Sequence, residues 1–184
     1  YANVALVQGR TKEALDYLRD LDRRLPDDPS VLKRLGETAF QLKDYDSARK
    51  YLEDYSELVP EIAPVEVQMA SMAIQAKQYK EARVFLDQAA ARYRDDLRAL
   101  AGMTQLFLEM DDPDRALKII AEAKRAETSS ATMVLLEGQA RFMKGEIEAA
   151  QHLFESLTRL APNNLGYSNL YALALAADRS EEHT

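Results

Sequence analysis

The sequence repeats itself at a constant interval of about 34 residues, and this period constrains the fold more than any other feature. An alanine recurs five times at this spacing, at Ala14, Ala48, Ala82, Ala116 and Ala150. A large apolar residue follows each alanine by four positions, at Leu18, Leu52, Leu86, Ile120 and Phe154, and another precedes it by eight, at Leu6, Phe40, Ile74, Leu108 and Phe142. Fixed self-similarity of this length is the signature of stacked supersecondary units. We therefore expect a solenoid in which every unit repeats the same packing.

The unit formed by residues 29–62 contains the pattern of two amphipathic helices. Apolar residues recur near the helical period of about 3.6 in both halves of the unit. They are Leu32, Leu35, Ala39, Phe40 and Leu42 in the first half, and Ala48, Tyr51, Leu52, Tyr55 and Leu58 in the second. Lys43 and Asp44 lie between the halves and are predicted to form the turn. The repeated alanine is small because two helices in a tight hairpin approach each other closely.

Residues with capping side chains precede most of the expected helices. Asp, Ser and Thr accept hydrogen bonds from the free amides of a first helical turn, and proline is tolerated at the first helical position. The predicted caps are Thr11, Asp28, Asp44, Asp96, Asp112 and Ser130, with Pro29 and Pro113 at first positions and Pro64 in the first turn of its helix. Asp111, Asp112 and Asp114 crowd one turn, but they lack the alternating oxygen ligands of a calcium loop, so capping is the favoured interpretation.

The residues that fill this unit resemble the tetratricopeptide repeat over nearly the whole chain. The second copy matches the family pattern with Leu32, Leu35, Gly36, Ala48, Leu52 and Pro60, and the fifth with Val134, Gly138, Gly145, Ala150, Phe154 and Pro162. The early tryptophan of the family is absent, Lys43 replaces the turn glycine, and Arg94 and Thr128 stand where proline is expected. The resemblance implies an all-α, right-handed superhelical solenoid of about five antiparallel helix pairs plus a final helix.

We expect one solenoid domain over residues 1–177. Its predicted repeats are residues 1–28 (partial), 29–62, 63–96, 97–130 and 131–164, followed by a final helix at 165–177 and a polar tail at 178–184. The chain begins at Tyr1 and not at methionine, so we expect a fragment of a longer protein. Apolar residues are spread around much of the final helix, whereas a true end cap has a polar outer face. Self-association through apolar terminal helices is therefore a further expectation.

Composition argues against several functional classes. The 184 residues carry a net charge of −7, which disfavours nucleic acid and anionic membranes as partners. The chain has no cysteine, and His152 and His183 are its only histidines, so thiolate metal sites and paired-histidine sites are not expected. No phosphate-binding loop or catalytic motif is present. No apolar run is long enough for direct membrane insertion. We expect no enzyme activity and no cofactor.

The resemblance places function on the concave groove, which the first helix of each pair lines in this family. The groove positions carried over are Asn3, Glu37, Ser71, Gln105 and Gln139, flanked by Lys33, Arg34, Gln68, Arg98, Gln41, Gln75 and Glu109. Amide side chains both donate and accept hydrogen bonds, which suits an extended peptide or a polar polymer. The alternative is that these are ordinary exposed polar residues. The Lys–Asn clamp of chaperone-binding members is not reproduced.

The sequence therefore predicts a non-enzymatic protein-interaction scaffold that binds a protein or an extended peptide, as part of a bacterial multi-protein assembly. The alternative is a periplasmic region of an envelope export system, for exopolysaccharide secretion or pilus assembly. Tetratricopeptide regions are common in such systems, so the resemblance favours the periplasm over the cytoplasm. An acidic surface suits a basic partner, whose binding would weaken with salt.

Overall fold

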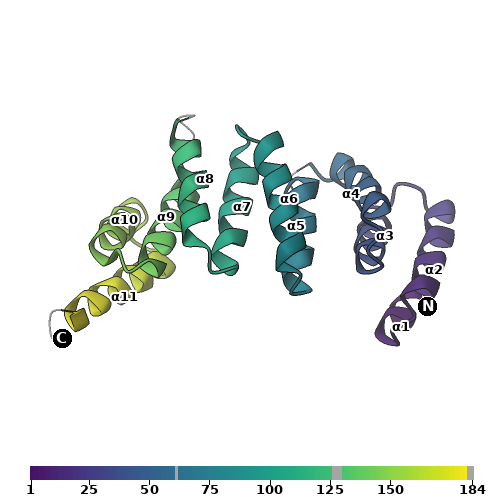
Figure 1. The fold of residues 1–184 in the computed structure, drawn as a ribbon, viewed down its shortest axis with the longest axis horizontal. Helices are drawn as coiled ribbons and strands as arrows, with labels where there is room; N and C mark the ends of the chain where they lie inside the picture. Colours follow the sequence, from purple (N-terminus) through teal and green to yellow (C-terminus); the bar gives the residue numbers. More distant parts are fainter. Residues whose placement is uncertain (61, 126–129, 182–184) are drawn as a thin grey trace. The chain divides into compact units, whose positions relative to one another are not determined.

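The computed structural model of the chain describes residues 1–60, 62–125 and 130–181, and this part contains eleven helices and no strand (Figure 1). The all-α prediction is thereby confirmed. The helices are α1 (Ala2–Val7), α2 (Thr11–Arg24), α3 (Pro29–Gln41), α4 (Tyr45–Leu58), α5 (Val65–Gln75), α6 (Tyr79–Arg92), α7 (Leu97–Glu109), α8 (Pro113–Arg125), α9 (Ala131–Met143), α10 (Ile147–Leu160) and α11 (Leu165–Glu181).

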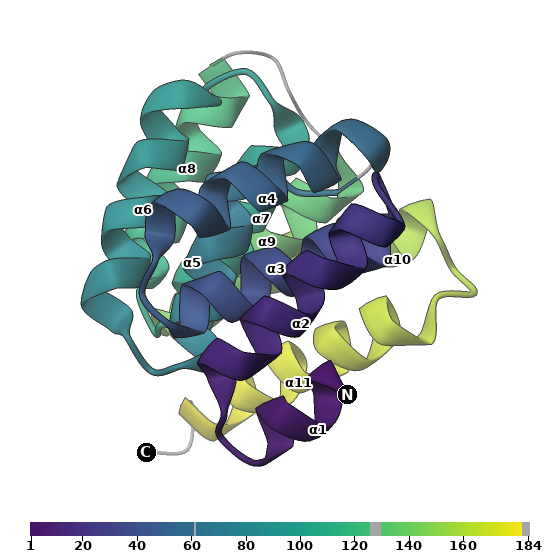
Figure 2. The same ribbon diagram turned by 90° about the vertical axis from the view of Figure 1, so that its right-hand side faces the viewer.

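The chain divides into two compact units, Tyr1–Gln88 and Ala89–Thr184, and the boundary falls inside α6. In the first unit each helix from α1 to α5 packs on the next, and α3 also packs on α5. In the second unit each helix from α7 to α11 packs on the next, and α7 also packs on α9. Figure 2 shows the short loop that joins α10 to α11. Consecutive helices therefore stack in both units as the repeat predicts.

The five repeated alanines form the centre of the helix pairs. All five are completely buried, and the large apolar residue four positions after each is at most 2% exposed. These residues lie on the second helix of each pair, and Leu52 and Phe154 press on glycines of the first helix. The 34-residue period of the sequence thus corresponds to the same two buried positions in each of the five repeats.

Two glycines show how closely the paired helices approach. A Cβ atom added to Gly36 on α3 would lie 2.7 Å from Cγ of Leu52 on α4. A Cβ atom added to Gly138 on α9 would clash with the ring of Phe154 on α10. Both large residues belong to the series that follows the buried alanines. The first helix of these two pairs therefore needs a residue without a side chain where the second helix presses on it.

The turn inside each pair uses the left-handed backbone conformation. Gly9, Lys43, Lys77, Asp111 and Gly145 occupy the same position of successive repeats and have φ between 55° and 76°. At the second turn the amide of Lys43 donates to the carbonyl of Phe40 (2.8 Å) and the amide of Asp44 to that of Ala39 (3.0 Å). This is the Schellman arrangement that closes a helix C-terminus. Glycine adopts it without steric cost, whereas lysine does not.

Most of the predicted caps are confirmed. The side chains of five residues accept hydrogen bonds from the amides of the following helix, namely Asp28, Asp44, Asp96, Asp112 and Ser130. The prediction at Thr11 is wrong, because Thr11 is the first helical residue and Arg10 occupies the cap position without a side-chain bond. Inside each pair the cap follows the left-handed residue of the turn. Asp44 directly follows the left-handed Lys43 and caps α4. Arg10 follows the left-handed Gly9 in the same way and therefore occupies the cap position of α2.

Two further helix boundaries differ from those predicted from the sequence. Pro64 lies just before α5, at its cap position, rather than in its first turn. The final helix runs to Glu181, four residues beyond the predicted end at Ala177. Arg94 lies between α6 and α7, in place of the family's proline. Thr128 and His183 are outside the described residues.

Replacing Gly138 with alanine tests the close approach of α9 and α10. We expect Gly138→Ala to lower the free energy of unfolding by about 1–3 kcal/mol, because overpacking against Phe154 outweighs the better helix propensity of alanine. The same change in a Phe154→Leu background should be much less harmful, since the smaller side chain leaves room for the new methyl group. Urea unfolding of the four chains measures the coupling. Additive effects would contradict this packing.

Replacing Lys43 or Lys77 with glycine tests the turn conformation. We expect either change to stabilise the chain by about 0.5–1 kcal/mol, because glycine reaches positive φ without the steric cost of a Cβ atom. Lys50→Gly on the exposed face of α4 is the matched control, and it should destabilise by about 1 kcal/mol. Thermal and urea unfolding measure all three. A loss of stability in both turn variants would rule out the interpretation.

Candidate functional site

The first unit has a hollow of about 410 Å³ on the exposed side of α3. Its lining is Pro29, Ser30, Lys33, Arg34, Glu37, Tyr55 and Val59. Lys33 Nζ lies 3.9 Å from Oε1 of Glu37, one turn further along the helix. Arg34 Nη1 donates to Oδ1 of Asn3 on α1 at 2.7 Å, so this guanidinium joins α1 to α3. Four of the residues proposed for the groove from sequence are thus neighbours here.

A second hollow of about 490 Å³ lies between α3 and α5. It is lined by Glu37, Phe40, Gln41, Met72, Gln75, Ala76 and Gln78. Glu37 borders both hollows, so the two are adjacent along α3. The lining mixes amide groups with the buried ring of Phe40. Such a surface offers hydrogen bonds to a peptide backbone and apolar contact to its side chains.

Four of the residues proposed from sequence line neither these hollows nor the pocket of the second unit described below, namely Asn3, Gln68, Ser71 and Arg98. The side chain of Gln68 points towards the N-terminal end of α5. Its Nε2 donates to the carbonyl of Ala63 (2.7 Å), just before α5, and to Oγ of Ser56 (3.4 Å) on α4. Ser71 is half-buried on α5. Arg98 is exposed at the start of α7, with Nε 4.0 Å from Oδ1 of Asp96. Gln68 and Arg98 therefore serve local contacts in the structure.

The second unit has a more apolar hollow of about 290 Å³, which we call the α9 pocket. Its lining is Gln105, Leu108, Glu109, Gln139, Phe142, Met143, Phe154, Leu170 and Leu173. These residues come from α7, α9, α10 and α11. Met143 is 42% exposed and Leu173 is 53% exposed, so two large apolar side chains at this site face water. Gln105 Nε2 donates to Oε1 of Glu109 at 3.3 Å along one edge.

The charge at the α9 pocket is negative. Of the described residues that line it, Glu109 alone is charged. The two cations at the end of α9 are held by carboxylates: Arg141 contacts Glu137 at 3.0 Å and Glu146 at 2.7 Å. Lys144 Nζ lies 2.8 Å from Asp114 on α8 and 3.3 Å from Glu146. Both cations are therefore paired with carboxylates that do not line the pocket.

These contacts shift the ionisation of the groups involved. Hydrogen bonds from Arg141 and then Lys144 hold the pKa of the Glu146 carboxyl below its usual range. The pKa of Lys144 is raised, chiefly by its hydrogen bond to Asp114. The pKa of Arg141 is raised, chiefly by its hydrogen bond to Glu137. Arg141, Lys144 and Glu146 therefore stay charged around neutral pH.

Sequence reasoning missed part of the apolar lining of the α9 pocket. Met143, Leu170 and Leu173 were not among the proposed groove residues, although Gln105, Glu109 and Gln139 were. A signal was present, because Leu173 follows Gln139 by one full repeat and continues the groove row into the final helix. In the first unit Tyr55 and Val59 were missed as well. Both lie near the end of a second helix, which the repeat pattern does not assign to the groove.

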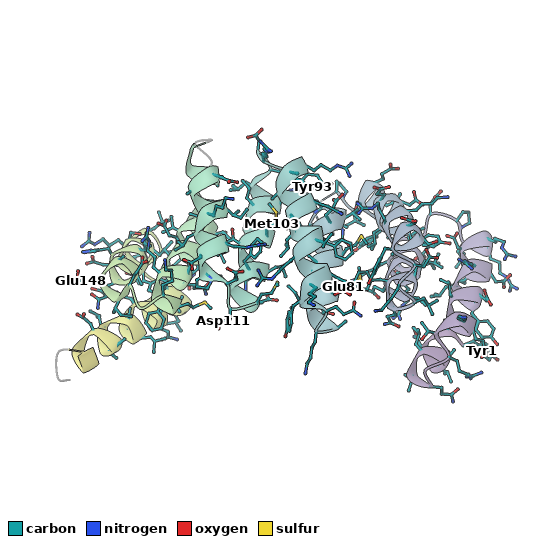
Figure 3. All side chains as sticks on the ribbon, viewed as in Figure 1. Tyr1, Glu81, Tyr93, Met103, Asp111 and Glu148 are labelled. Atoms are coloured by element: carbon teal, nitrogen blue, oxygen red, sulfur yellow. The ribbon has the colours of Figure 1, made fainter. Side chains whose placement is uncertain are left out.

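The three aspartates at the turn between α7 and α8 serve the turn itself, a helix cap and an ion pair. Asp111, labelled in Figure 3, occupies the left-handed turn position. Asp112 accepts from the amide of Arg115 at 3.3 Å, and Asp114 pairs with Lys144. Within residues 1–60, 62–125 and 130–181, no group of His, Cys, Asp and Glu is arranged to hold a metal ion. None of the described helices is long and apolar enough to span a membrane.

Comparison with known proteins places the chain among repeat proteins. The family model described as "Tetratricopeptide repeat" matches residues 5–68 and 73–133. No curated protein sequence matches. A tetratricopeptide repeat protein from Parabacteroides merdae aligns at 20% identity over 95% of this chain and 68% of that one, with a TM-score of 0.58.

Two further solved structures show the same fold. The C-terminal part of a repeat protein from Cytophaga hutchinsonii aligns at 20% identity over 98% of this chain and 71% of that one, with a TM-score of 0.58. YrrB, described as having an unusual peptide-binding site, aligns at 17% identity over 97% of this chain and 88% of that one, with a TM-score of 0.53. At these identities the likeness concerns the fold alone.

Replacing Glu146 with glutamine tests the charge cluster at the end of α9. Because the pKa of Glu146 is lowered on folding, its contribution to stability is present above the unfolded pKa of about 4.3 and is lost as pH falls through the folded value. We expect Glu146→Gln to be less stable than the natural chain at neutral pH, and we expect this difference to shrink as the pH falls below about 4.3. Urea unfolding across this range measures the difference. A difference that does not change with pH would contradict the assignment.

Proposed function

The chain belongs to the tetratricopeptide repeat family, and from this premise we propose that it is a non-enzymatic scaffold that binds an extended segment of a partner protein along its first helices. Repeats of this family generally mediate protein interactions. The strongest support is that hollows open on the first helices of both units. Eight of the residues proposed from sequence line them, namely Lys33, Arg34, Glu37, Gln41, Gln75, Gln105, Glu109 and Gln139.

The chemistry of these hollows suits a peptide better than a small reactive substrate. Glutamine side chains recur in the lining of both units and can pair with the donors and the acceptors of a peptide backbone. Apolar side chains lie beside them, as is usual where a peptide side chain is bound. YrrB, whose fold this chain shares, is described as having a peptide-binding site.

We propose further that the partner is a basic component of a bacterial multi-protein assembly. The net charge of −7 favours association with a positively charged surface. A periplasmic export system for exopolysaccharide or pilus assembly is the alternative setting, and the same acidic charge supports it when the exported polymer or its carrier is cationic. Both settings require that binding weakens as salt rises, because the Debye length falls to about 3 Å at 1 M salt.

A crosslinking experiment with matched variants tests the scaffold function. The groove variant carries Gln41→Arg and Gln105→Arg, one exposed change on a first helix of each unit. The control carries Glu53→Gln and Glu148→Gln on second helices, with the same change in net charge. We expect partners identified by crosslinking in the native host to be captured at least about tenfold less by the groove variant, equivalent to about 1.4 kcal/mol, and normally by the control.

Two results would contradict the scaffold function. One is capture that is equal for the natural chain, the groove variant and the control. The other is a set of crosslinks confined to second helices such as α4 and α10, away from the first helices that form the proposed binding surface.

A further inference from the structure

We propose that the α9 pocket binds one large apolar side chain of an extended peptide segment that carries a lysine or arginine beside it. This inference rests on the proposed function and specifies which ligand one part of the groove accepts. It concerns the second unit alone, and it follows from the size, the lining and the charge of the pocket.

The size and lining of the pocket suit a single apolar side chain. Its volume of about 290 Å³ is at the lower end of the range for small-molecule sites, which is roughly 300–1,000 Å³. Leu108, Phe142 and Phe154 provide apolar walls, and Phe154 is almost fully buried. Met143 and Leu173 stand exposed at the opening, so a bound leucine, phenylalanine or methionine would remove both from water. The flexible methionine can adjust to the shape of the guest side chain.

The polar edge of the pocket suits an extended backbone. Gln105 and Gln139 occupy equivalent positions of successive first helices, α7 and α9, which pack against each other. Each amide can donate to a peptide carbonyl and accept from a peptide amide. When an extended peptide adds to a sheet edge, hydrogen bonds to the peptide backbone provide affinity while pockets select the side chains, and we expect the same division of roles here. The two glutamines thus align a segment whose apolar side chain enters the pocket.

The charge at the edge selects a basic neighbour. Glu109 is exposed at the pocket, and among the lining residues its carboxylate accepts from the neutral amide of Gln105. The cations at the end of α9 are engaged with Glu137, Glu146 and Asp114. A lysine or arginine of the peptide would replace the neutral amide of Gln105 as the partner of Glu109, and a charge-assisted hydrogen bond is stronger than a neutral one.

A display library of random peptides, screened against the whole chain, tests this specificity. Selected peptides should share a Leu, Phe or Met with a Lys or Arg next to it. Screening against Glu109→Lys should replace the basic residue with Asp or Glu and keep the apolar one. Glu148→Lys is the matched control, because Glu148, labelled in Figure 3, is exposed on α10 and does not line the pocket. This variant should select the original pattern.

A second variant tests the apolar contact with the selected peptides as probes. Leu173→Lys removes an exposed apolar side chain and adds a positive charge at the opening, so folding should be retained. We expect synthetic copies of the selected peptides to bind this variant at least about tenfold more weakly. Circular dichroism confirms that the variant is folded.

The outcomes separate this inference from the proposed function. If peptides are enriched without a shared apolar residue, or if Glu109→Lys leaves the charge preference unchanged, the pocket assignment is overturned while the scaffold function stands. If selected peptides bind the Leu173→Lys variant with unchanged affinity, the assignment is also overturned. If no peptide is enriched over a screen without the protein, both the assignment and the proposed peptide-binding function fail.

Discussion

Two of the helix pairs depend on the contact between a large apolar residue of the second helix and a glycine of the first helix. The contacts are those of Leu52 on Gly36 and Phe154 on Gly138, and neither glycine has room for a Cβ atom. The buried alanine four residues earlier lets the second helix lie close along its length. One hairpin is too small to cover its own apolar face, so stability in such a fold is shared between neighbouring pairs.

This close approach also fixes the turn. A second helix that must return along the first within a few residues uses the left-handed turn at every pair, whichever residue stands there. Gly9 and Gly145 suit that conformation, whereas Lys43, Lys77 and Asp111 adopt it because the packing on both sides requires it. Backbone strain is thus tolerated at three turns because the buried contacts outweigh it. The following residue then becomes the cap, which explains why Arg10 and not Thr11 precedes α2.

The exposed faces of the first helices remain available because the core is built on their other side. In the first unit they carry mixed charges, with Lys33, Arg34 and Glu37 close together on α3. In the second unit Arg141 and Lys144 are drawn towards carboxylates on α8, α9 and the turn after α9. That arrangement leaves Glu109 and two amides around an apolar pocket. The two units therefore offer different chemistry from the same repeated framework.

The sequence by itself determined the helix pairs, their period and five of the caps, and it contained eight of the polar residues that line the hollows, because each depends on local pattern or on repetition. It also contained Leu173 in the groove row, one repeat after Gln139. The tertiary structure alone decided that Gln68 turns to the carbonyl of Ala63, that Arg34 meets Asn3, and that Met143, Leu170 and Phe154 join in one pocket. Those contacts depend on how side chains from different helices meet. A pattern in the sequence does not give the distances between such side chains.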